Sequence, residues 1–230
     1  MSAILRAYVN DGNMLNEMNT IKPWVFDRDV ACDFNEIANK NIPDYERVIA
    51  QCVQIISKMG IENPHIIDVG CATGNTLRQL YNAGFTRLTG VDSSQDMLNT
   101  INLPVAQLIL SKNFPRHQGR YDAVLANWTL HFIKDRKTYL TAIAESLSTN
   151  GVLILTEKTQ SSKIMQVLYR EFKRANGLTD EEIRIKEQQL AGVLTPYPVN
   201  WYLRLLPQLG FVQIEIINAR YGFVSFLARK

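Results

Sequence analysis

Short apolar runs alternate with segments of helical periodicity through the middle of the chain, and this alternation constrains the fold more than any other feature. The runs predict strands at 65–70, 87–92, 105–110, 121–127 and 151–157, and the segments between them predict helices at 75–82, 93–101 and 135–147. Strands that alternate with helices pair in parallel, because each helix crosses over the sheet to reach the next strand. The sequence therefore predicts a doubly wound, mostly parallel α/β fold.

The segments that flank this alternation predict further helices and a closing strand pair. Residues 43–59 have helical periodicity, with one apolar face made by Tyr45, Val48, Ile49, Cys52, Ile55 and Ile56. Residues 161–209 are helical in pattern, with interruptions at Gly177 and at 195–198, and strands are expected at 211–217 and 222–229. We expect a single domain over 1–230 with a seven-stranded sheet. It divides into an N-terminal arm and cap helices (1–60), a core (61–157), a helical lid (158–209) and a C-terminal strand pair (210–230).

Composition narrows the class of protein. The chain has 230 residues, of which 46% are hydrophobic, and can bury the core of one large domain. Its net charge is +3 without a long basic run, which favours a small-molecule substrate over nucleic acid. Cys32, Cys52 and Cys71 fit neither a disulfide framework nor a zinc site, so no metal is expected. No segment has the apolar length of a signal peptide or a membrane span, so we expect a soluble cytoplasmic protein with no membrane partner.

The segment after the first predicted strand reads Asp68-Val-Gly70-Cys-Ala-Thr-Gly74. Glycine at 70 and 74 permits a tight turn and a close approach to a ligand, at the sheet edge where open α/β folds bind ligands. A dinucleotide fingerprint would need glycine also at 72 and 75, where the chain has Ala72 and Asn75. The spacing instead resembles motif I of class I methyltransferases. That resemblance implies S-adenosyl-L-methionine as cofactor and S-adenosyl-L-homocysteine as product.

Asp92 ends the second predicted strand and is a second acidic residue at the same edge. A carboxylate there can accept hydrogen bonds from both ribose hydroxyls of a nucleoside, although it can also cap the helix that follows. Met97 lies on that helix and can pack either on the adenine or in the core.

The fourth predicted strand ends at Asn127, and Trp128 and His131 follow it. In class I methyltransferases, residues past this strand face both the methionine moiety and the substrate. Asn127 can hold the amino-acid end of the cofactor, and Trp128 can wall the reacting centre. His131 can act as a general base, because histidine exchanges protons near neutral pH, or it can be a hydrogen-bonded structural residue.

Several stretches also resemble a narrower family, the carboxy-S-adenosyl-L-methionine synthases of the tRNA wobble-uridine pathway. These are Trp24-Val-Phe26-Asp27 with Val30-Ala31, Ile42-Pro43-Asp-Tyr45, Asp68-Val-Gly70-Cys71, Asn127-Trp-Thr129-Leu130, Glu157-Lys158, and Phe172-Lys-Arg-Ala-Asn-Gly177 with Glu182 and Ile183. The resemblance spans roughly residues 24–230. It implies a homodimer with a helical lid, in which Tyr45 reaches the cofactor. It also implies conversion of S-adenosyl-L-methionine and prephenate to a carboxylated sulfonium, through a sulfonium ylide that captures carbon dioxide.

Three positions depart from that family's pattern. Ten residues after Gly177, where the family has an arginine for the extra carboxylate, this chain has Glu187. At about 4 Å and an effective dielectric near 20, such a sign reversal changes an interaction on the order of 4 kcal/mol. Arg184 lies one turn earlier on the same helical face and can substitute, whereas Lys186 is expected to point elsewhere. The stretch 111–113 lacks the family's acidic residue, and His131 stands where the family has glutamine.

These features support three hypotheses. The first is a methyltransferase that uses S-adenosyl-L-methionine on a small molecule, the second a carboxy-S-adenosyl-L-methionine synthase, and the third a non-catalytic S-adenosyl-L-methionine-binding protein. Expected cofactor contacts are Tyr45, Asp68, Gly70, Cys71, Ala72, Gly74, Asp92, Ser93, Met97, Ser111 and Asn127. The expected catalytic residues are His131 and Trp128. The expected substrate pocket has Arg184, Glu187, Tyr197, Trp201 and Tyr202, although core packing also explains the three aromatic residues.

Overall fold

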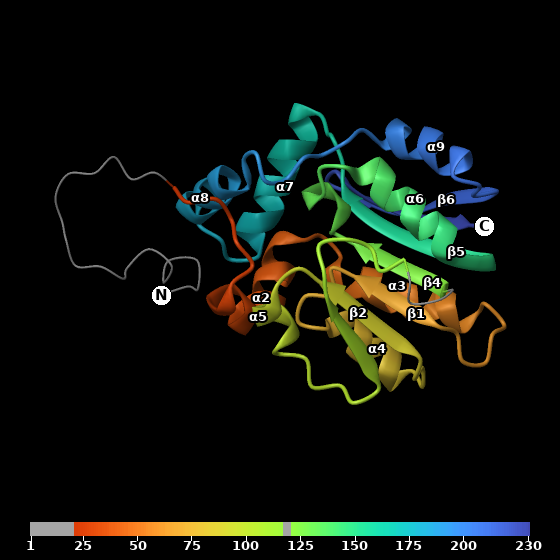
Figure 1. The fold of residues 1–230 in the computed structure, drawn as a ribbon. Coiled ribbons are helices and arrows are strands. Elements are labelled where there is room, and N and C mark those ends of the chain that lie inside the picture. The colour runs from red at the N-terminus through yellow and green to blue at the C-terminus, as the bar shows by residue number, and fades with distance from the viewer. Residues whose placement is uncertain (1–20, 117–120) are drawn as a thin grey trace.

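The computed structural model describes residues 21–116 and 121–230, and it has a seven-stranded sheet at its centre (Figure 1). The strands are β1 (Ile66–Val69), β2 (Leu88–Asp92), β3 (Ala106–Leu110), β4 (Tyr121–Asn127), β5 (Leu147–Lys158), β6 (Gln213–Arg220) and β7 (Phe223–Arg229). They lie in the order β3-β2-β1-β4-β5-β7-β6. The first five pair in parallel, and β7 is antiparallel to both β5 and β6. The predicted doubly wound, mostly parallel sheet is confirmed.

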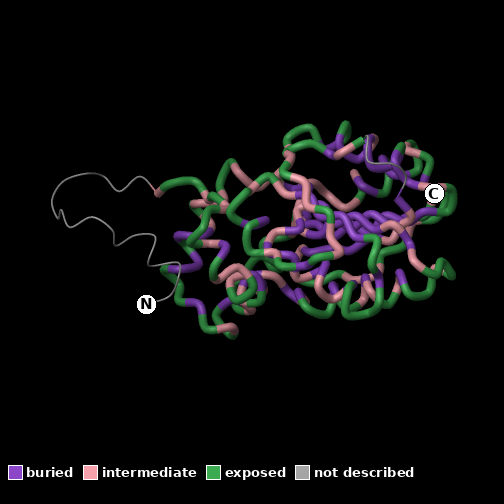
Figure 2. Tube along the Cα trace, turned by 60° about the horizontal axis from the view of Figure 1, so that its bottom comes forward, coloured by how far each residue is buried: buried purple, intermediate pink, exposed green. Residues whose placement is uncertain are grey.

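Helices cover both faces of this sheet. They are α2 (Arg28–Asn41), α3 (Tyr45–Ser57), α4 (Asn75–Asn82), α5 (Gln95–Leu98), the short 3₁₀ helix η1 (Leu130–Phe132), α6 (Arg136–Ser146), α7 (Lys163–Ala175), α8 (Asp180–Leu190) and α9 (Val199–Gln208). Helices α6 and α9 pack on one face, and α3, α4 and α5 pack on the other (Figure 1). The central strands are buried between the two helical layers, as Figure 2 shows.

The sequence pattern predicts the bounds of one N-terminal helix, α3, but not those of the other, α2. Helix α3 carries the apolar face predicted for 43–59, and that face is buried against α4 and the sheet. Helix α2 has a shorter apolar stripe of Ala31, Phe34, Ile37 and Ala38, and Phe34 and Ile37 line a cavity and are only partly buried. It begins at Asp27, whose side chain accepts a hydrogen bond from the Val30 amide at 3.0 Å. The predicted N-terminal arm falls on residues 1–20, outside the described residues.

The predicted lid segment 158–209 divides into two parts with different packing. Helices α7 and α8 lie beside α2, away from the centre of the sheet (Figure 1). Helix α9 instead packs on the sheet beside α6, with Tyr202, Leu205 and Leu206 in the main core. Within residues 21–116 and 121–230, the model has no helix that combines the length and the apolar character of a membrane span.

A buried polar network joins η1, α6 and α9 to the end of β5. Arg136 is 1% exposed and donates to the Leu130 carbonyl, the Tyr202 hydroxyl and the Thr195 carbonyl, each at 2.7 Å. The Tyr202 hydroxyl in turn donates to Glu157 Oε2 at 3.0 Å. Because these groups are shielded from water, each depends on the others for its hydrogen bonds. The network fixes the chain at the carboxyl end of the sheet.

Substitution Tyr202→Phe tests this network. It removes the hydroxyl that links Arg136 to Glu157 and leaves a buried donor and a buried acceptor short of a partner. We expect the free energy of unfolding to fall by about 1–3 kcal/mol in urea denaturation. The control is Tyr81→Phe on the exposed end of α4, which should change it by less than about 0.5 kcal/mol. Equal effects of the two substitutions would show that the hydroxyl has no such role.

Candidate active site

A cavity of about 450 Å³ opens at the carboxyl edge of the parallel strands, a size typical of small-molecule sites. Each of the five parallel strands contributes a lining residue at or just after its carboxyl end: Gly70, Asp92, Ser111, Asn127 and Lys158. Helices α2, α3, α7 and α8 supply the remaining walls together with η1. The position agrees with the general rule that open α/β sheets bind ligands outside the carboxyl ends of their strands.

The glycine loop after β1 forms the floor of the cavity. Gly70 has a φ of 69°, and a Cβ at this position would overlap the side chain of Thr129. The Thr129 hydroxyl donates to the Val69 carbonyl at 2.9 Å, so it cannot move aside without losing a bond. Ala72 also has a positive φ of 46°, a conformation that L-residues seldom adopt and that is common at functional sites.

Two carboxylates mark one end of the cavity. Asp92 accepts hydrogen bonds from the Ala72 and Ser94 amides, each at 2.9 Å. Asp68 is 3% exposed, and burial, followed by the nearby charge of Asp92, raises the pKa of its carboxyl to about 8. Burial raises the pKa of Asp92 as well. Both groups therefore gain from a ligand that brings hydroxyl or cationic donors.

The helix after β2 resolves the two interpretations of Asp92 and Met97. Helix α5 is capped by Ser94, whose hydroxyl accepts from the Met97 amide at 3.2 Å, and Asp92 lines the cavity. Met97 is 1% exposed and is not among the lining residues, because it lies on the inner face of α5. This burial agrees with the core-packing alternative that the sequence analysis gave for Met97.

Three buried polar atoms on the cavity walls have no hydrogen-bond partner among the described residues. They are Asn41 Oδ1, Asn127 Oδ1 and Trp128 Nε1. Buried polar groups normally find partners, so unsatisfied ones that face a cavity indicate a ligand. Trp128 also has a positive φ of 55°, and its ring lies 4.8 Å from that of Tyr45. Tyr45, Asn127 and Trp128 thus converge on the cavity, where the sequence analysis expected them.

His131 lines the cavity with its side chain largely enclosed. Its Nδ1 lies 3.3 Å from Glu157 Oε1 and 3.3 Å from the Lys158 amide nitrogen. Nδ1 can donate to the carboxylate or accept from the amide, but not both at once. When Nδ1 holds the proton, Nε2 carries a lone pair and can take a proton. Glu157 is therefore placed to orient His131, although the sequence analysis named Glu157 only as part of the family resemblance and gave it no role.

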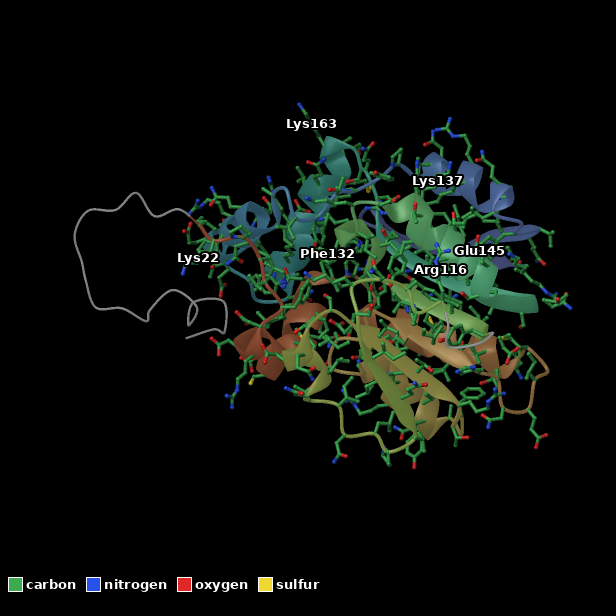
Figure 3. All side chains as sticks on the ribbon, in the orientation of Figure 1. Lys22, Arg116, Phe132, Lys137, Glu145 and Lys163 are labelled. Atoms are coloured by element: carbon green, nitrogen blue, oxygen red, sulfur yellow. The ribbon has the colours of Figure 1, made fainter. Side chains whose placement is uncertain are left out.

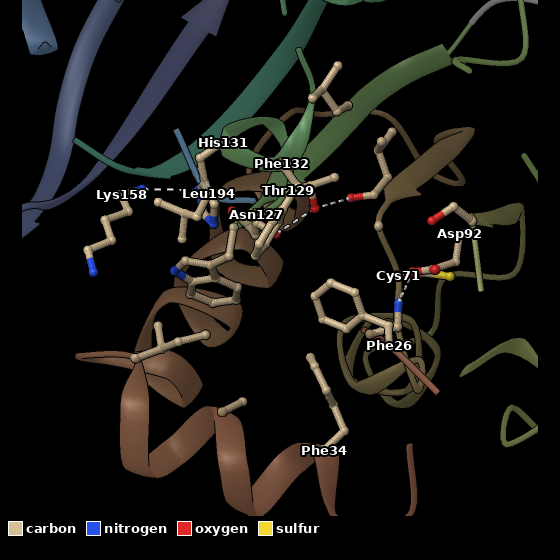
Figure 4. A pocket seen from close by; sticks show the side chains of 18 of the residues that line it. Phe26, Phe34, Cys71, Asp92, Asn127, Thr129, His131, Phe132, Lys158 and Leu194 are labelled. Carbon is tan, nitrogen blue, oxygen red and sulfur yellow. Dashed lines mark hydrogen bonds between the residues drawn. The ribbon is translucent and has the colours of Figure 1, made fainter. Parts of the chain in front are cut away.

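A strap of residues 21–27 covers the cavity. The Trp24 amide donates to the Gln189 carbonyl at 2.9 Å on α8, and the Ser94 hydroxyl donates to the Phe26 carbonyl at 2.6 Å. The Phe26 ring meets that of Phe132 edge-to-face at 5.4 Å. Figure 4 shows Phe26 and Phe34 beside the cavity. The strap joins the two ends of the cavity roof.

The structure brings most of the predicted cofactor contacts together. The predicted contacts that line the cavity are Tyr45, Asp68, Gly70, Cys71, Ala72, Asp92, Ser93, Ser111 and Asn127. The two expected catalytic residues, Trp128 and His131, line it as well. Gly74 does not line it; it precedes α4 with a φ of 77° and supports the turn from below.

The predicted substrate-pocket residues are the main correction. Arg184, Glu187, Tyr197, Trp201 and Tyr202 do not line the cavity. Tyr202 belongs to the buried Arg136 network, and Tyr197 and Trp201 pack beside it. Arg184 is half exposed and donates to Glu181 and Gln188 on its own helix. Tyr197, Trp201 and Tyr202 therefore agree with the core-packing alternative that the sequence analysis left open.

Glu187 and Lys186 have exchanged the places that the sequence analysis expected. Glu187 forms a two-pronged ion pair with Arg170 on the outer side of α7 and α8, at 3.0 and 2.8 Å. Lys186 instead points inward and lines the cavity, together with Lys158 and Lys173. The packing of α8 against α7 turns residue 186 to the inner face.

Fold and site together define the class: a doubly wound sheet with a glycine loop after β1, an acidic residue at the end of β2 and a cavity at the strand ends is the class I methyltransferase architecture. Residues 42–204 match the model of a methyltransferase domain family. The chain belongs to this family of S-adenosyl-L-methionine-dependent enzymes.

Curated relatives place the chain more narrowly. It is 31% identical to the carboxy-S-adenosyl-L-methionine synthase of Campylobacter jejuni subsp. doylei, over 94% of this chain and 98% of that protein. It is also 31% identical to the synthase of Trichodesmium erythraeum, over 91% and 89%. The chain belongs to the family of these proteins.

Solved structures agree on the fold. A methyltransferase of Methanococcus maripaludis superposes with a TM-score of 0.62 at 22% identity, covering 95% of this chain and 97% of that one. The plantazolicin methyltransferase BpumL, solved with S-adenosylhomocysteine, superposes with a TM-score of 0.65 at 15% identity, covering 88% and 90%. The fold that carries the cavity is therefore shared with these enzymes.

The residues of the cavity fit S-adenosyl-L-methionine. Asp92 can accept from ribose hydroxyls, and the unsatisfied Asn127 Oδ1 can accept from the ammonium of the methionine moiety. The carboxylate of Asp92 also favours a cationic ligand electrostatically, whereas Asp68, with a pKa raised to about 8, is largely protonated at neutral pH.

Substitution Asp92→Ala tests this placement. It removes a charged acceptor from the ribose position, so the Kd for S-adenosyl-L-homocysteine should rise by about tenfold or more in calorimetry. The control is Asp96→Ala, an exposed carboxylate on α5 that should leave the Kd within about twofold. Unfolding curves of both variants check that the loop around Ala72 stays folded. Unchanged affinity in Asp92→Ala would rule out the ribose contact.

Proposed function

We propose that the protein transfers the methyl group of S-adenosyl-L-methionine to a small acceptor inside the cavity. The observation that carries this proposal is the extent of the cavity. It runs from Asp92, past Asn127 and Trp128, into a chamber walled by α2, α7 and α8. A nucleoside at Asp92 fills one end only, and the remainder of a cavity of about 450 Å³ suits a small molecule better than a polymer.

The side chains can be assigned roles within this proposal. Asp92 binds the ribose, Asn127 holds the amino-acid end and Trp128 shapes the reacting centre. The bound cofactor supplies an electrophilic methyl group. His131 takes the proton of the acceptor through Nε2 while Glu157 holds the proton on Nδ1. The strap and the lid helices exclude water and orient the acceptor, and positioning of this kind lowers the barrier to in-line attack.

A second candidate is a carboxy-S-adenosyl-L-methionine synthase that acts on S-adenosyl-L-methionine and prephenate. The relatives with this name match nearly the whole chain. The argument against this activity was repulsion of the carboxylate by Glu187, but the charge of Glu187 is paired with Arg170 outside the cavity. Arg184 is not a replacement for the family arginine, because it pairs with Glu181 on the surface. Lys158, Lys173 and Lys186 line the cavity instead, and their ammonium groups can pair with a carboxylate.

Two further features are part of the proposal. A homodimer follows from the resemblance to the synthase family, and a cytoplasmic location follows from the cofactor and the composition. A non-catalytic S-adenosyl-L-methionine-binding protein is the third hypothesis, and the cavity space beyond the proposed cofactor position argues against it.

Methyl-labelled S-adenosyl-L-methionine separates these hypotheses in one assay. The protein is incubated with it and with the small-molecule fraction of a cell extract, and prephenate is added in a parallel arm. We expect the label to appear on a small product that has lost the nucleoside. Label retained on a heavier, carboxylated sulfonium would instead establish the synthase. Absence of any conversion, or label in macromolecules only, would contradict the proposal.

Substitution His131→Gln tests the base. It keeps a polar side chain of similar size but cannot carry the proton, so the transfer rate should fall by roughly 10²–10⁴. The Kd for S-adenosyl-L-homocysteine should stay within about twofold, because His131 is assigned to the acceptor. An unchanged transfer rate would show that His131 is a structural residue and not the base.

A further inference from the structure

Two buried polar atoms of the cavity wall remain without a partner once Asn127 is assigned to the cofactor. They are Asn41 Oδ1, at the end of α2, and Trp128 Nε1, just after β4. Neither forms a hydrogen bond with residues 21–116 or 121–230, and Asn41 is only 8% exposed. A surface group such as Lys163, which Figure 3 shows pointing outward, can bond to water instead. Because enclosed polar groups are nearly always hydrogen-bonded, two on a cavity wall indicate a ligand.

The orientation of the Asn41 amide is fixed by the bond that it does make. Its Nδ2 donates to the Ile37 carbonyl on the same helix at 2.9 Å, so Oδ1 is the atom left over. The Asn41 backbone carbonyl accepts from the Tyr169 hydroxyl on α7 at 2.7 Å, and the Tyr169 ring lies 4.5 Å from Lys158 Nζ. Figure 4 shows Lys158 and Asp92 on opposite sides of the cavity. Asn41 therefore belongs to the acceptor space and not to the nucleoside end.

The Trp128 ring is held in one position on the same wall. Its backbone has a φ of 55°, which is unfavourable for tryptophan, and its amide donates to the Thr156 carbonyl at 2.6 Å. The ring lies 4.8 Å from that of Tyr45 and packs on the apolar cluster between α2 and α3, as does Ile42. Since Ile42 directly follows Asn41, the indole N–H and the Asn41 side-chain oxygen lie on one wall of the cavity.

An amide oxygen and an indole N–H together select one kind of chemical group. Asn41 Oδ1 can only accept a hydrogen bond, and Trp128 Nε1 can only donate one. A carboxylate cannot donate to the first atom, and an ammonium cannot accept from the second. A neutral hydroxyl can do both through a single oxygen, which suits two partners on one wall. The neighbouring rings of Phe34 and Phe132 have no polar atom that could replace either partner.

We propose that Asn41 and Trp128 are specificity-determining residues that bind a neutral hydroxyl group of the methyl acceptor. This proposal rests on the proposed function, because the hydroxyl binds in the space beyond the cofactor position. It donates to Asn41 Oδ1 and accepts from Trp128 Nε1, so one group satisfies both atoms. A molecule without the hydroxyl leaves both atoms unpaired, and a site of this kind rejects such a molecule more strongly than an apolar pocket rejects a missing methyl group.

Three matched probes, para-fluorophenol, para-fluoroanisole and para-fluorotoluene, test the pair. The phenol donates and accepts, the ether only accepts, and the toluene does neither. Each is titrated at neutral pH, where the phenol keeps its proton, into the protein saturated with S-adenosyl-L-homocysteine, and binding is followed by fluorine NMR. We expect each probe to bind roughly fivefold more tightly than the next in that order. Equal affinity of the three would mean that water satisfies both atoms, and would overturn the proposal.

Substitutions Asn41→Leu and Trp128→Phe should act on different probes. Asn41→Leu removes the acceptor, so the phenol should lose its advantage over the ether while the ether keeps its affinity. Trp128→Phe keeps a ring against Tyr45 but removes the donor, so the phenol and the ether should each weaken by roughly fivefold and the toluene should not. If a substitution shifts all three affinities equally, that residue contributes only shape and its assignment fails.

The matched controls are Asn39→Leu and Trp201→Phe. Asn39 is exposed on α2, and its side chain donates to the Asn35 carbonyl in the way that Asn41 donates to Ile37. Trp201 packs on the core outside the cavity. Neither control should alter the order of the probes. A structural role for Asn41 predicts instead that Asn41→Leu lowers the melting temperature by several degrees and leaves the phenol preferred, which would overturn the assignment.

Binding of S-adenosyl-L-homocysteine separates this inference from the proposed function. If the wild-type protein does not bind it, the proposed function fails. If the protein binds it and the probes show no order, only the assignment of Asn41 and Trp128 fails. If either substitution weakens S-adenosyl-L-homocysteine by roughly tenfold while the probes keep their order, that residue holds the cofactor, and its role toward the acceptor is overturned.

Discussion

Parallel pairing of β1 between β2 and β4 is the constraint on which the rest of the structure depends. The register pairs Val69 with Val91 and Asp68 with Leu125, so the ends of three strands reach the same edge. The chain leaves that edge through the Gly70 turn, which has room only for a glycine beside Thr129. Asp92 and Asn127 follow from the same register. Had β1 paired antiparallel with either neighbour, these groups would lie at opposite edges of the sheet.

The cavity built on that edge is electrostatically polarised. At one end, burial raises the pKa of both Asp68 and Asp92, and the nearby charge of Asp92 raises the pKa of Asp68 further. At the other end, burial lowers the pKa of Lys158 and Lys173. At the lysine end, the ammonium groups form no hydrogen bond or ion pair within residues 21–116 and 121–230, whereas Asp92 accepts hydrogen bonds from the Ala72 and Ser94 amides. Stability given up in this way is typical of binding sites, where a ligand restores the missing interactions.

Sequence reasoning succeeded where one local rule fixes a residue's position. Gly70, Asp92 and Asn127 were found because strand ends in a parallel sheet converge, and the same rule applied to the fifth strand would have added Lys158. It failed on α8, because residues 186 and 187 differ by only about 100° in direction, and helix packing decides which one faces inward. Periodicity alone could not show that rotation, since α8 has few apolar residues to mark its buried face.

A crystal structure with S-adenosyl-L-homocysteine bound would test the central claim most directly. The claim is that one cavity joins a nucleoside end at Asp92 to an acceptor space that Lys158, Lys173 and Lys186 line. The account predicts ribose hydroxyls hydrogen-bonded to Asp92, the amino-acid end at Asn127, and no contact between the ligand and Lys173 or Lys186. A nucleoside bound outside this cavity, or a cofactor carboxylate seated on those lysines, would contradict it.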